Sequence, residues 1–99
     1  MKKTIRFFFD WGAYDCFWGG EEDLIPYEWL GISEELETTL RDMAKEFQTA
    51  LDWEYPLAPS PWSEEHKKDF LERAEKVYDR ILAEIGDKYE VIYRVFLPD

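Results

Sequence analysis

Residues 63–86, SEEHKKDFLERAEKVYDRILAEIG, decide the fold of this 99-residue chain. They begin with a serine and two glutamates, which are an N-cap oxygen and two carboxylates that favour the first turn of a helix. Apolar side chains then recur at spacings of three and four, and a glycine follows where helices commonly end. The segment therefore predicts a helix over residues 64–85 with one apolar stripe, formed by Phe70, Leu71, Ala74, Val77, Tyr78, Ile81, Leu82 and Ile85.

A second stripe of the same kind precedes this helix. Ser33, Glu34 and Glu35 repeat the start signal, and the spacing predicts a helix over residues 34–51. Residues 53–62 contain three prolines, which remove backbone donors and disfavour helix, so we expect a stiff connector between the two helices. The apolar stripe of the earlier helix consists of Leu36, Leu40, Met43, Ala44, Phe47, Ala50 and Leu51.

Three segments alternate in the way that strands do. Residues 4–11 are rich in aromatic side chains, and residues 14–18 end at two glycines, so these two segments predict a short antiparallel hairpin. Residues 89–96 predict a third strand, whose partner and direction stay open. Residues 21–32 show no sustained period and are expected to form an ordered loop that packs its apolar side chains against the fold.

The order strand, strand, helix, helix, strand predicts a single α+β domain over residues 1–99. Each helix has one apolar stripe and the sheet has one strongly apolar face, so these surfaces can bury one another. We expect a two-layer sandwich in which a small, mainly antiparallel sheet packs on two helices. The domain is expected to be a monomer or a weak homodimer.

The charge balance restricts the class of partner. The chain has 23 acidic and 12 basic residues, which gives a net charge of −11 at neutral pH. Direct binding to nucleic acid or to an anionic membrane is disfavoured, because such binding depends on lysines and arginines that displace counterions. Nine of the acids lie in residues 7–40, which contain no lysine or arginine, so this stretch is expected to face a basic protein.

Aromatic residues are interleaved with these acids. Tryptophan and tyrosine anchor many protein interfaces, and a carboxylate-rimmed aromatic patch suits an Arg- and Lys-rich partner. The alternative for most of these rings is the core of a small aromatic domain, with Trp29 the one expected to be exposed. The candidate partner-binding residues are Asp10, Asp15, Glu21, Glu22, Asp23, Glu28 and Trp29.

No pattern predicts catalysis, a metal site or a cofactor. Cys16 and His66 are the single cysteine and the single histidine, and a buried inert thiol with an exposed imidazole is the favoured interpretation. Neighbouring carboxylates at the helix starts are not held across a cleft, as acid–base catalysis requires. The run Glu21, Glu22 and Asp23 lacks the spacing of a calcium loop. We therefore expect a protein that is not an enzyme and that binds neither metal nor cofactor.

The compartment is also constrained. A lone cysteine excludes an internal disulfide and fits a reducing cytoplasm. The apolar run near the start is interrupted by Asp10, so no export signal is expected, and no stretch approaches the length of a membrane span.

Several segments together resemble a family of small acidic bacterial immunity proteins from polymorphic or contact-dependent growth inhibition toxin–immunity pairs. The resemblance lies in residues 7–12, 16–19, 27–36, 51–56, 61–63 and 86–91, and it covers most of the chain. It implies a cytoplasmic, non-enzymatic protein that binds one cognate toxin domain and neutralises it by occlusion. Nuclease toxins present basic surfaces, so a basic nuclease-type toxin is the expected partner. The alternatives are an acidic adaptor or regulatory interaction module and, less favoured, a small hydrolase with a carboxylate pair.

Overall fold

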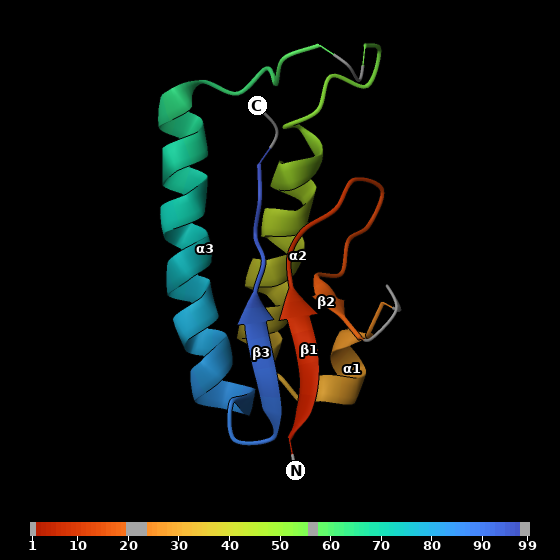
Figure 1. Cartoon of the computed structure of the whole chain (residues 1–99), viewed down its shortest axis with the longest axis vertical. Coiled ribbons are helices and arrows are strands. Elements are labelled where there is room, and N and C mark those ends of the chain that lie inside the picture. Colours follow the sequence, from red (N-terminus) through yellow and green to blue (C-terminus); the bar gives the residue numbers. More distant parts are fainter. Residues whose placement is uncertain (1, 20–23, 56–57, 98–99) are drawn as a thin grey trace.

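The computed structural model describes residues 2–19, 24–55 and 58–97. Three strands and three helices follow one another in the order β1 (Lys3–Phe7), β2 (Phe17–Trp18), α1 (Tyr27–Leu30), α2 (Glu34–Gln48), α3 (Glu64–Ile85) and β3 (Tyr89–Tyr93). Figure 1 shows the sheet in front of α2, with α3 alongside β3 and the connector between the helices at the far end from the N-terminus. The predicted α+β class and the two-layer arrangement are confirmed.

Both long helices begin where the sequence predicts, because each has a working N-cap. The Ser33 hydroxyl accepts the N–H of Leu36 at 3.2 Å, and the Ser63 hydroxyl accepts the N–H of His66 at 3.1 Å. The α3 helix also ends where expected, with Gly86 as its C-cap.

The α2 helix stops three residues earlier than predicted. Its last carbonyls bond to residues just beyond the helix: the Thr49 hydroxyl donates to the Glu46 carbonyl at 2.7 Å, and the Ala50 N–H donates to the Phe47 carbonyl at 2.9 Å. These short-range bonds close the helix before residue 51. The apolar stripe nevertheless continues, since Ala50 is fully buried beyond the helix end.

One turn of helix lies within the segment that was expected to be a loop. Tyr27–Leu30 forms α1, and Gly31 ends it with φ of 72°, a left-handed conformation that glycine adopts without strain. A four-residue helix is too short to produce a periodic signal in the sequence. Its Tyr27 and Leu30 side chains are buried, as expected for apolar residues of this segment.

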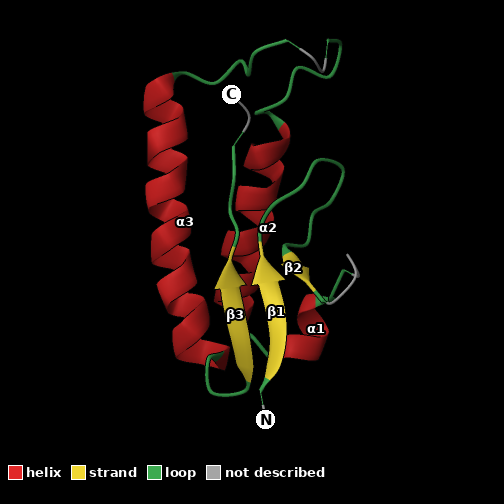
Figure 2. Ribbon diagram, viewed as in Figure 1, coloured by secondary structure: helices red, strands yellow, loops and turns green. Residues whose placement is uncertain are grey.

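The sheet is mixed, with β1 at its centre. The expected antiparallel pairing is present, since β1 and β2 pair through Arg6 with Trp18 and Phe7 with Phe17, but β2 is shorter than the predicted strand over residues 14–18. The longer ladder joins β1 to β3 in parallel, from Lys3 opposite Tyr89 to Phe7 opposite Tyr93. The sheet is therefore not mainly antiparallel, because α3 returns the chain to the end of the sheet where β1 begins (Figure 2).

The core is largely aromatic, and the alternation that starts in β1 runs past the end of the strand. Phe9 follows the last ladder residue and is still 1% exposed. Its ring lies 5.8 Å from the ring of Phe47 on α2 and 5.4 Å from that of Phe70 on α3. The hydrogen-bonded strand is Lys3–Phe7, which is shorter than predicted, but the alternating burial continues to Phe9. Phe9 joins the strand layer to both helices.

Within the residues that the structure describes, no helix combines the length and the apolar character needed to cross a membrane.

Candidate partner-binding surface

The predicted partner-binding residues fall into three groups. Glu21, Glu22 and Asp23 lie outside the described residues. Asp10 and Asp15 lie in the segment that joins β1 to β2, and Glu28 and Trp29 lie on α1.

Asp15 and Glu28 meet at one pocket. The pocket measures about 300 Å³ and is formed where the segment after β1, α1 and α2 converge. Three carboxylates line it, because Glu37 from the first turn of α2 joins the two predicted residues. The lining residues are Asp15, Pro26, Tyr27, Glu28, Glu37 and Arg41.

One guanidinium faces these three carboxylates. The Nη1 atom of Arg41 lies 3.7 Å from Asp15 Oδ1, and its Nε atom lies 3.4 Å from Glu37 Oε2. The same guanidinium stacks 4.8 Å from the ring centre of Tyr27. Arg41 is the first basic residue after the base-free stretch. Its single positive charge balances one of the three carboxylates, so the pocket keeps a negative charge.

Asp15 retains capacity to accept a donor. Its Oδ1 atom is buried and has no hydrogen-bond partner among the described residues, and its ion pair with Arg41 is long, at 3.7 Å. A buried carboxylate oxygen is stabilised by a hydrogen bond from a charged donor, and an arginine or lysine of a partner can supply that bond.

Asp10 does not share this pocket. Its Oδ1 atom accepts the N–H of Trp11 at 2.8 Å, and its carbonyl accepts the Gln48 side-chain amide at 3.0 Å. Gln48 also accepts the N–H of Gly12 at 2.7 Å and donates to the carbonyl of Ala13 at 3.0 Å. Gln48 therefore fixes the segment that carries both predicted aspartates, and no sequence signal singles it out.

Trp29 is exposed, as predicted. Its side chain is 70% exposed, whereas Tyr27 and Leu30 on the same helical turn are 2% exposed. The short helix α1 thus buries one face and presents Trp29 to solvent beside the acidic pocket. Its contact with a partner stays a prediction.

The other aromatic rings of the N-terminal third divide between core and surface. Phe17 is fully buried, as the core interpretation predicts, while Tyr14 is 52% exposed. Tyr14 lines a hollow of about 540 Å³ together with Arg41 and Lys45, so positive charge borders the acidic surface on the α2 side.

The connector presents aromatic rings that the sequence interpretation missed. Trp53 and Tyr55 are 57% and 69% exposed. Because this segment contains prolines and small residues, the sequence predicted only a stiff connector. The available signal was the pair of aromatic residues in a segment without the alternation that would bury them.

Cys16 and His66 have different partners. The Cys16 thiol is fully buried and lies 3.5 Å from the Tyr27 hydroxyl, and burial raises its pKa, which suppresses the reactive thiolate. His66 lies 2.8 Å from Glu46 through Nε2 and stacks on Trp62 at 3.8 Å. No contact joins the thiol to the imidazole among the described residues, so the structure gives no support to a Cys–His nucleophile pair.

His66 belongs to an ion-pair cluster between α2 and α3. Arg73 donates to Glu46 from Nη1 and Nη2, at 2.8 and 2.5 Å, and to Asp69 from Nε at 2.8 Å. The Arg73 hydrogen bonds hold the pKa of Glu46 below its ordinary value. This cluster fixes the start of α3 against the end of α2. Across the described ranges, no group of three or more His, Cys, Asp or Glu side chains is placed to hold a metal ion.

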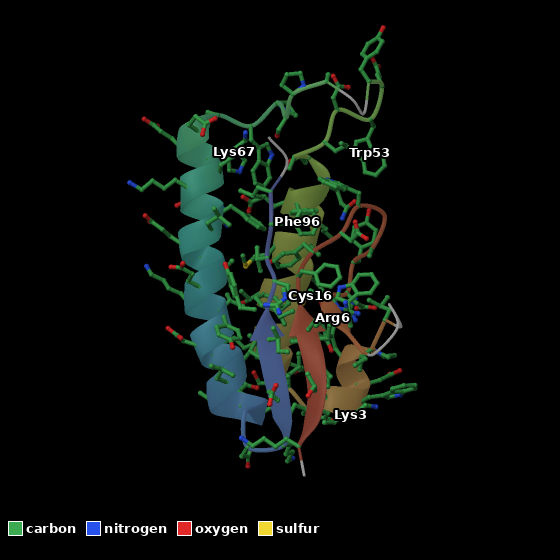
Figure 3. All side chains as sticks on the ribbon, in the orientation of Figure 1. Lys3, Arg6, Cys16, Trp53, Lys67 and Phe96 are labelled. Atoms are coloured by element: carbon green, nitrogen blue, oxygen red, sulfur yellow. The ribbon has the colours of Figure 1, made fainter. Side chains whose placement is uncertain are left out.

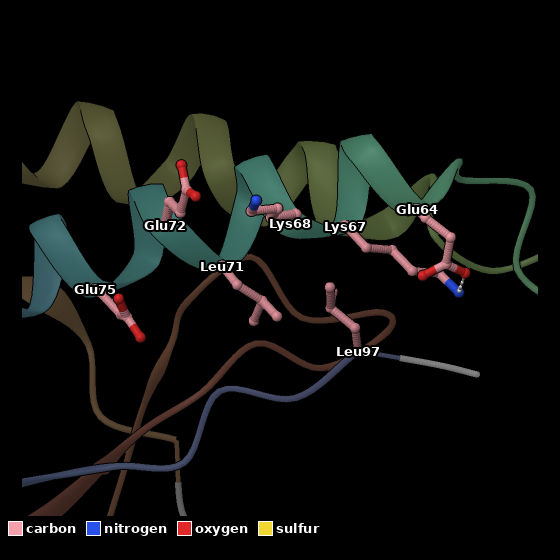
Figure 4. Close-up of a pocket in the computed structure, with 7 residues that line it drawn as sticks. All are labelled: Glu64, Lys67, Lys68, Leu71, Glu72, Glu75 and Leu97. Atoms are coloured by element: carbon pink, nitrogen blue, oxygen red, sulfur yellow. Dashed lines mark ion pairs between the residues drawn. The ribbon is translucent and has the colours of Figure 1, made fainter.

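A larger hollow lies elsewhere, between α3 and Leu97 (Figure 4), and measures about 660 Å³. Charges of both signs line it, and Lys67 pairs with Glu64 at 3.6 Å. This balance favours neither a basic nor an acidic ligand. The acidic pocket by α1 is therefore the better match to the charge of the chain.

A model of the Serratia CdiI immunity protein-like family matches residues 3–95, which is most of the chain. No curated protein matches it.

Proposed function

The chain belongs to the Serratia CdiI immunity protein-like family, and from this membership we propose that it neutralises one cognate toxin domain by covering the toxin's active or substrate-binding site. The toxin that we propose is a basic, nuclease-type domain. Nucleases bind a polyanion through lysines and arginines, so an acidic protein that occupies such a surface excludes the substrate.

The observation that carries this proposal is the acidic pocket beside an exposed tryptophan. Three carboxylates there face one guanidinium, and Trp29 projects from the same short helix that supplies Glu28. A toxin arginine or lysine that enters the pocket would pair with the uncompensated carboxylates, while Trp29 supplies a desolvated anchor. Asp10, Glu21, Glu22 and Asp23 complete the proposed contact set.

Association rates test the charge part of the proposal. Glu28→Lys should slow association with the toxin domain encoded beside this gene several-fold at low salt, and the effect should shrink as salt screens the charges. Glu90→Lys is the matched control, since Glu90 is an exposed acid on β3. Stopped-flow binding at several salt concentrations measures both. Equal effects of the two reversals would show that the pocket is not the contact.

Dissociation rates test the anchor. Trp29→Ala should accelerate dissociation by about tenfold or more, because truncating an interface tryptophan commonly costs that much. Surface plasmon resonance measures the rate. If the wild-type protein does not bind the toxin domain at all, the result would favour the alternative function, an acidic adaptor.

We also propose that neutralisation involves no catalysis. Cys16→Ala and His66→Ala should each leave protection against the toxin intact, after circular dichroism has shown that the variant is folded. Cys16→Ala is expected to lower stability slightly because the thiol is fully buried. Loss of protection in a folded variant would revive an enzymatic role.

A further inference from the structure

The connector between α2 and α3 is described over residues 49–55 and 58–63, and hydrogen bonds join its two ends. The Trp62 indole N–H donates to the Thr49 hydroxyl at 2.8 Å, and the Ser60 hydroxyl donates to the Ala50 carbonyl at 2.5 Å. These bonds tie the two ends of the connector together. Compact surface loops with adjoining ends are frequently functional.

Hydrogen bonds also fix the exposed aromatic residues of the connector. The Oδ1 atom of Asp52 accepts the N–H groups of Glu54 and Tyr55, both at 3.1 Å, which forms a side-chain turn. The Trp53 indole N–H donates to the Gln48 carbonyl at 2.8 Å. The Trp53 ring and the Tyr55 backbone are thus held in place, while both rings remain more than half exposed. Rings that are ordered before binding lose less entropy in an interface, so this arrangement suits a contact surface.

The connector is also acidic. Residues 46–66 contain no lysine or arginine, which makes them a second base-free stretch besides residues 7–40. Glu46 is occupied by Arg73 and His66, whereas Glu54 is exposed between the two aromatic residues. An exposed carboxylate flanked by aromatic rings complements arginine and lysine through ion pairing and cation–π contact.

The connector and the segment after β1 meet at Gln48. The Gln48 side chain binds Asp10, Gly12 and Ala13, while its carbonyl binds Trp53. Figure 3 shows Trp53 at the end of the molecule away from Lys3, above the segment that joins β1 to β2. The aromatic tip of the connector therefore adjoins Asp10 of the proposed contact set.

We propose that Trp53, Glu54 and Tyr55 form a second anchor for an Arg- and Lys-rich face of the same toxin domain, beside Asp10 and apart from the pocket at α1. This inference rests on the proposed function. It extends the contact surface from the N-terminal third of the sequence to the connector, through the shared attachment at Gln48.

The test compares three truncations in binding to the toxin domain encoded beside this gene. Tyr55→Ala is the principal variant, because the bond to Asp52 uses the Tyr55 backbone and survives the change. Trp29→Ala reports on the α1 surface. Leu82→Ala is the control, since Leu82 is an exposed apolar residue of α3. We expect Tyr55→Ala to accelerate dissociation about tenfold and Leu82→Ala to leave it unchanged.

Charge reversal and hydrogen exchange complete the test. Glu54→Lys should slow association several-fold at low salt. The amides of residues 52–55 should become protected from exchange in the wild-type complex. These results together support the second anchor.

The failures are distinguishable. If Trp29→Ala weakens binding while Tyr55→Ala and Glu54→Lys behave like the control, the second anchor is overturned and the proposed function stands. If the wild-type protein does not bind the toxin domain, both proposals are overturned.

Discussion

Two segments of this protein combine aromatic and acidic residues but differ in how far their central rings are buried. The segment after β1 buries Phe9, and the connector exposes Trp53 and Tyr55. Phe9 continues the alternation of a strand whose one face meets the helices, so its burial is imposed by the sheet. The connector has no such alternation. It buries Trp62 near its end, whereas hydrogen bonds of the Trp53 indole and of the Tyr55 backbone fix Trp53 and Tyr55 where their rings stay exposed. Aromatic composition alone therefore does not decide between a core and a contact surface.

The two segments also differ in what holds them. Neutral groups fix the segment after β1, mainly the Gln48 side chain and the Tyr27 hydroxyl, which donates to the Tyr14 carbonyl at 3.2 Å. The connector leads into α3, whose start is held by the charged cluster of Glu46, His66 and Arg73. We therefore expect acid to weaken the second attachment more than the first, whose one ion pair, between Asp15 and Arg41, is long at 3.7 Å.

The largest expected effect comes from truncating one ring in each segment. Phe9→Ala should lower the free energy of unfolding by about 3–5 kcal/mol, because it opens a cavity between the sheet and both helices. Tyr55→Ala should change it by less than about 0.5 kcal/mol, since the ring is 69% exposed. Urea denaturation followed by circular dichroism measures both. Similar losses of unfolding free energy in the two variants would contradict the distinction between a buried ring at Phe9 and an exposed ring at Tyr55.

A smaller effect is expected from removing the side chain that both segments meet. Gln48→Ala should cost about 1–2 kcal/mol and should increase hydrogen exchange in residues 10–13. Exchange in residues 52–55 should not change, because the bond to Trp53 uses the Gln48 carbonyl. Lys45→Ala, one turn earlier on α2 and exposed, is the control. Faster hydrogen exchange in residues 10–13 and 52–55 alike would mean that the two segments open as one unit.

The smallest effect concerns the charged attachment and depends on pH. Glu46→Gln should cost about 1 kcal/mol at neutral pH, because the cluster is partly exposed to solvent. Arg73 holds the pKa of Glu46 below its ordinary value of 4.5, so the folded state binds the proton less readily than the unfolded chain does. The contribution is complete above that value and is lost as pH falls through the lowered pKa.

Denaturation at pH 7 and at progressively lower pH checks this dependence. The stability difference between the wild-type protein and Glu46→Gln should shrink in acid. Glu35→Gln is the matched control, since Glu35 pairs with Arg80 on the surface and is 81% exposed. A difference that stays constant from neutral pH to acid would contradict the ionic attachment.

The sequence predicted those features that depend on neighbouring residues. The starts of α2 and α3 were correct because an N-cap serine bonds a backbone group only three residues away. The apolar stripes were correct because a helix places residues three and four apart on one face. The antiparallel pairing of β1 with β2 was also correct, although the connection between them, residues 8–16, is longer than a tight turn. The exposure of Trp29 was expected from its place in an acidic segment.

Only the tertiary structure decided the features that join distant residues. The parallel pairing of β1 with β3 depends on the end of the sheet to which α3 returns the chain. The acidic pocket combines side chains from three elements, and Gln48 bonds to residues 35–38 positions away. Local patterns specify secondary structure and burial along one element, but the meeting of side chains across elements is set by packing of the whole core.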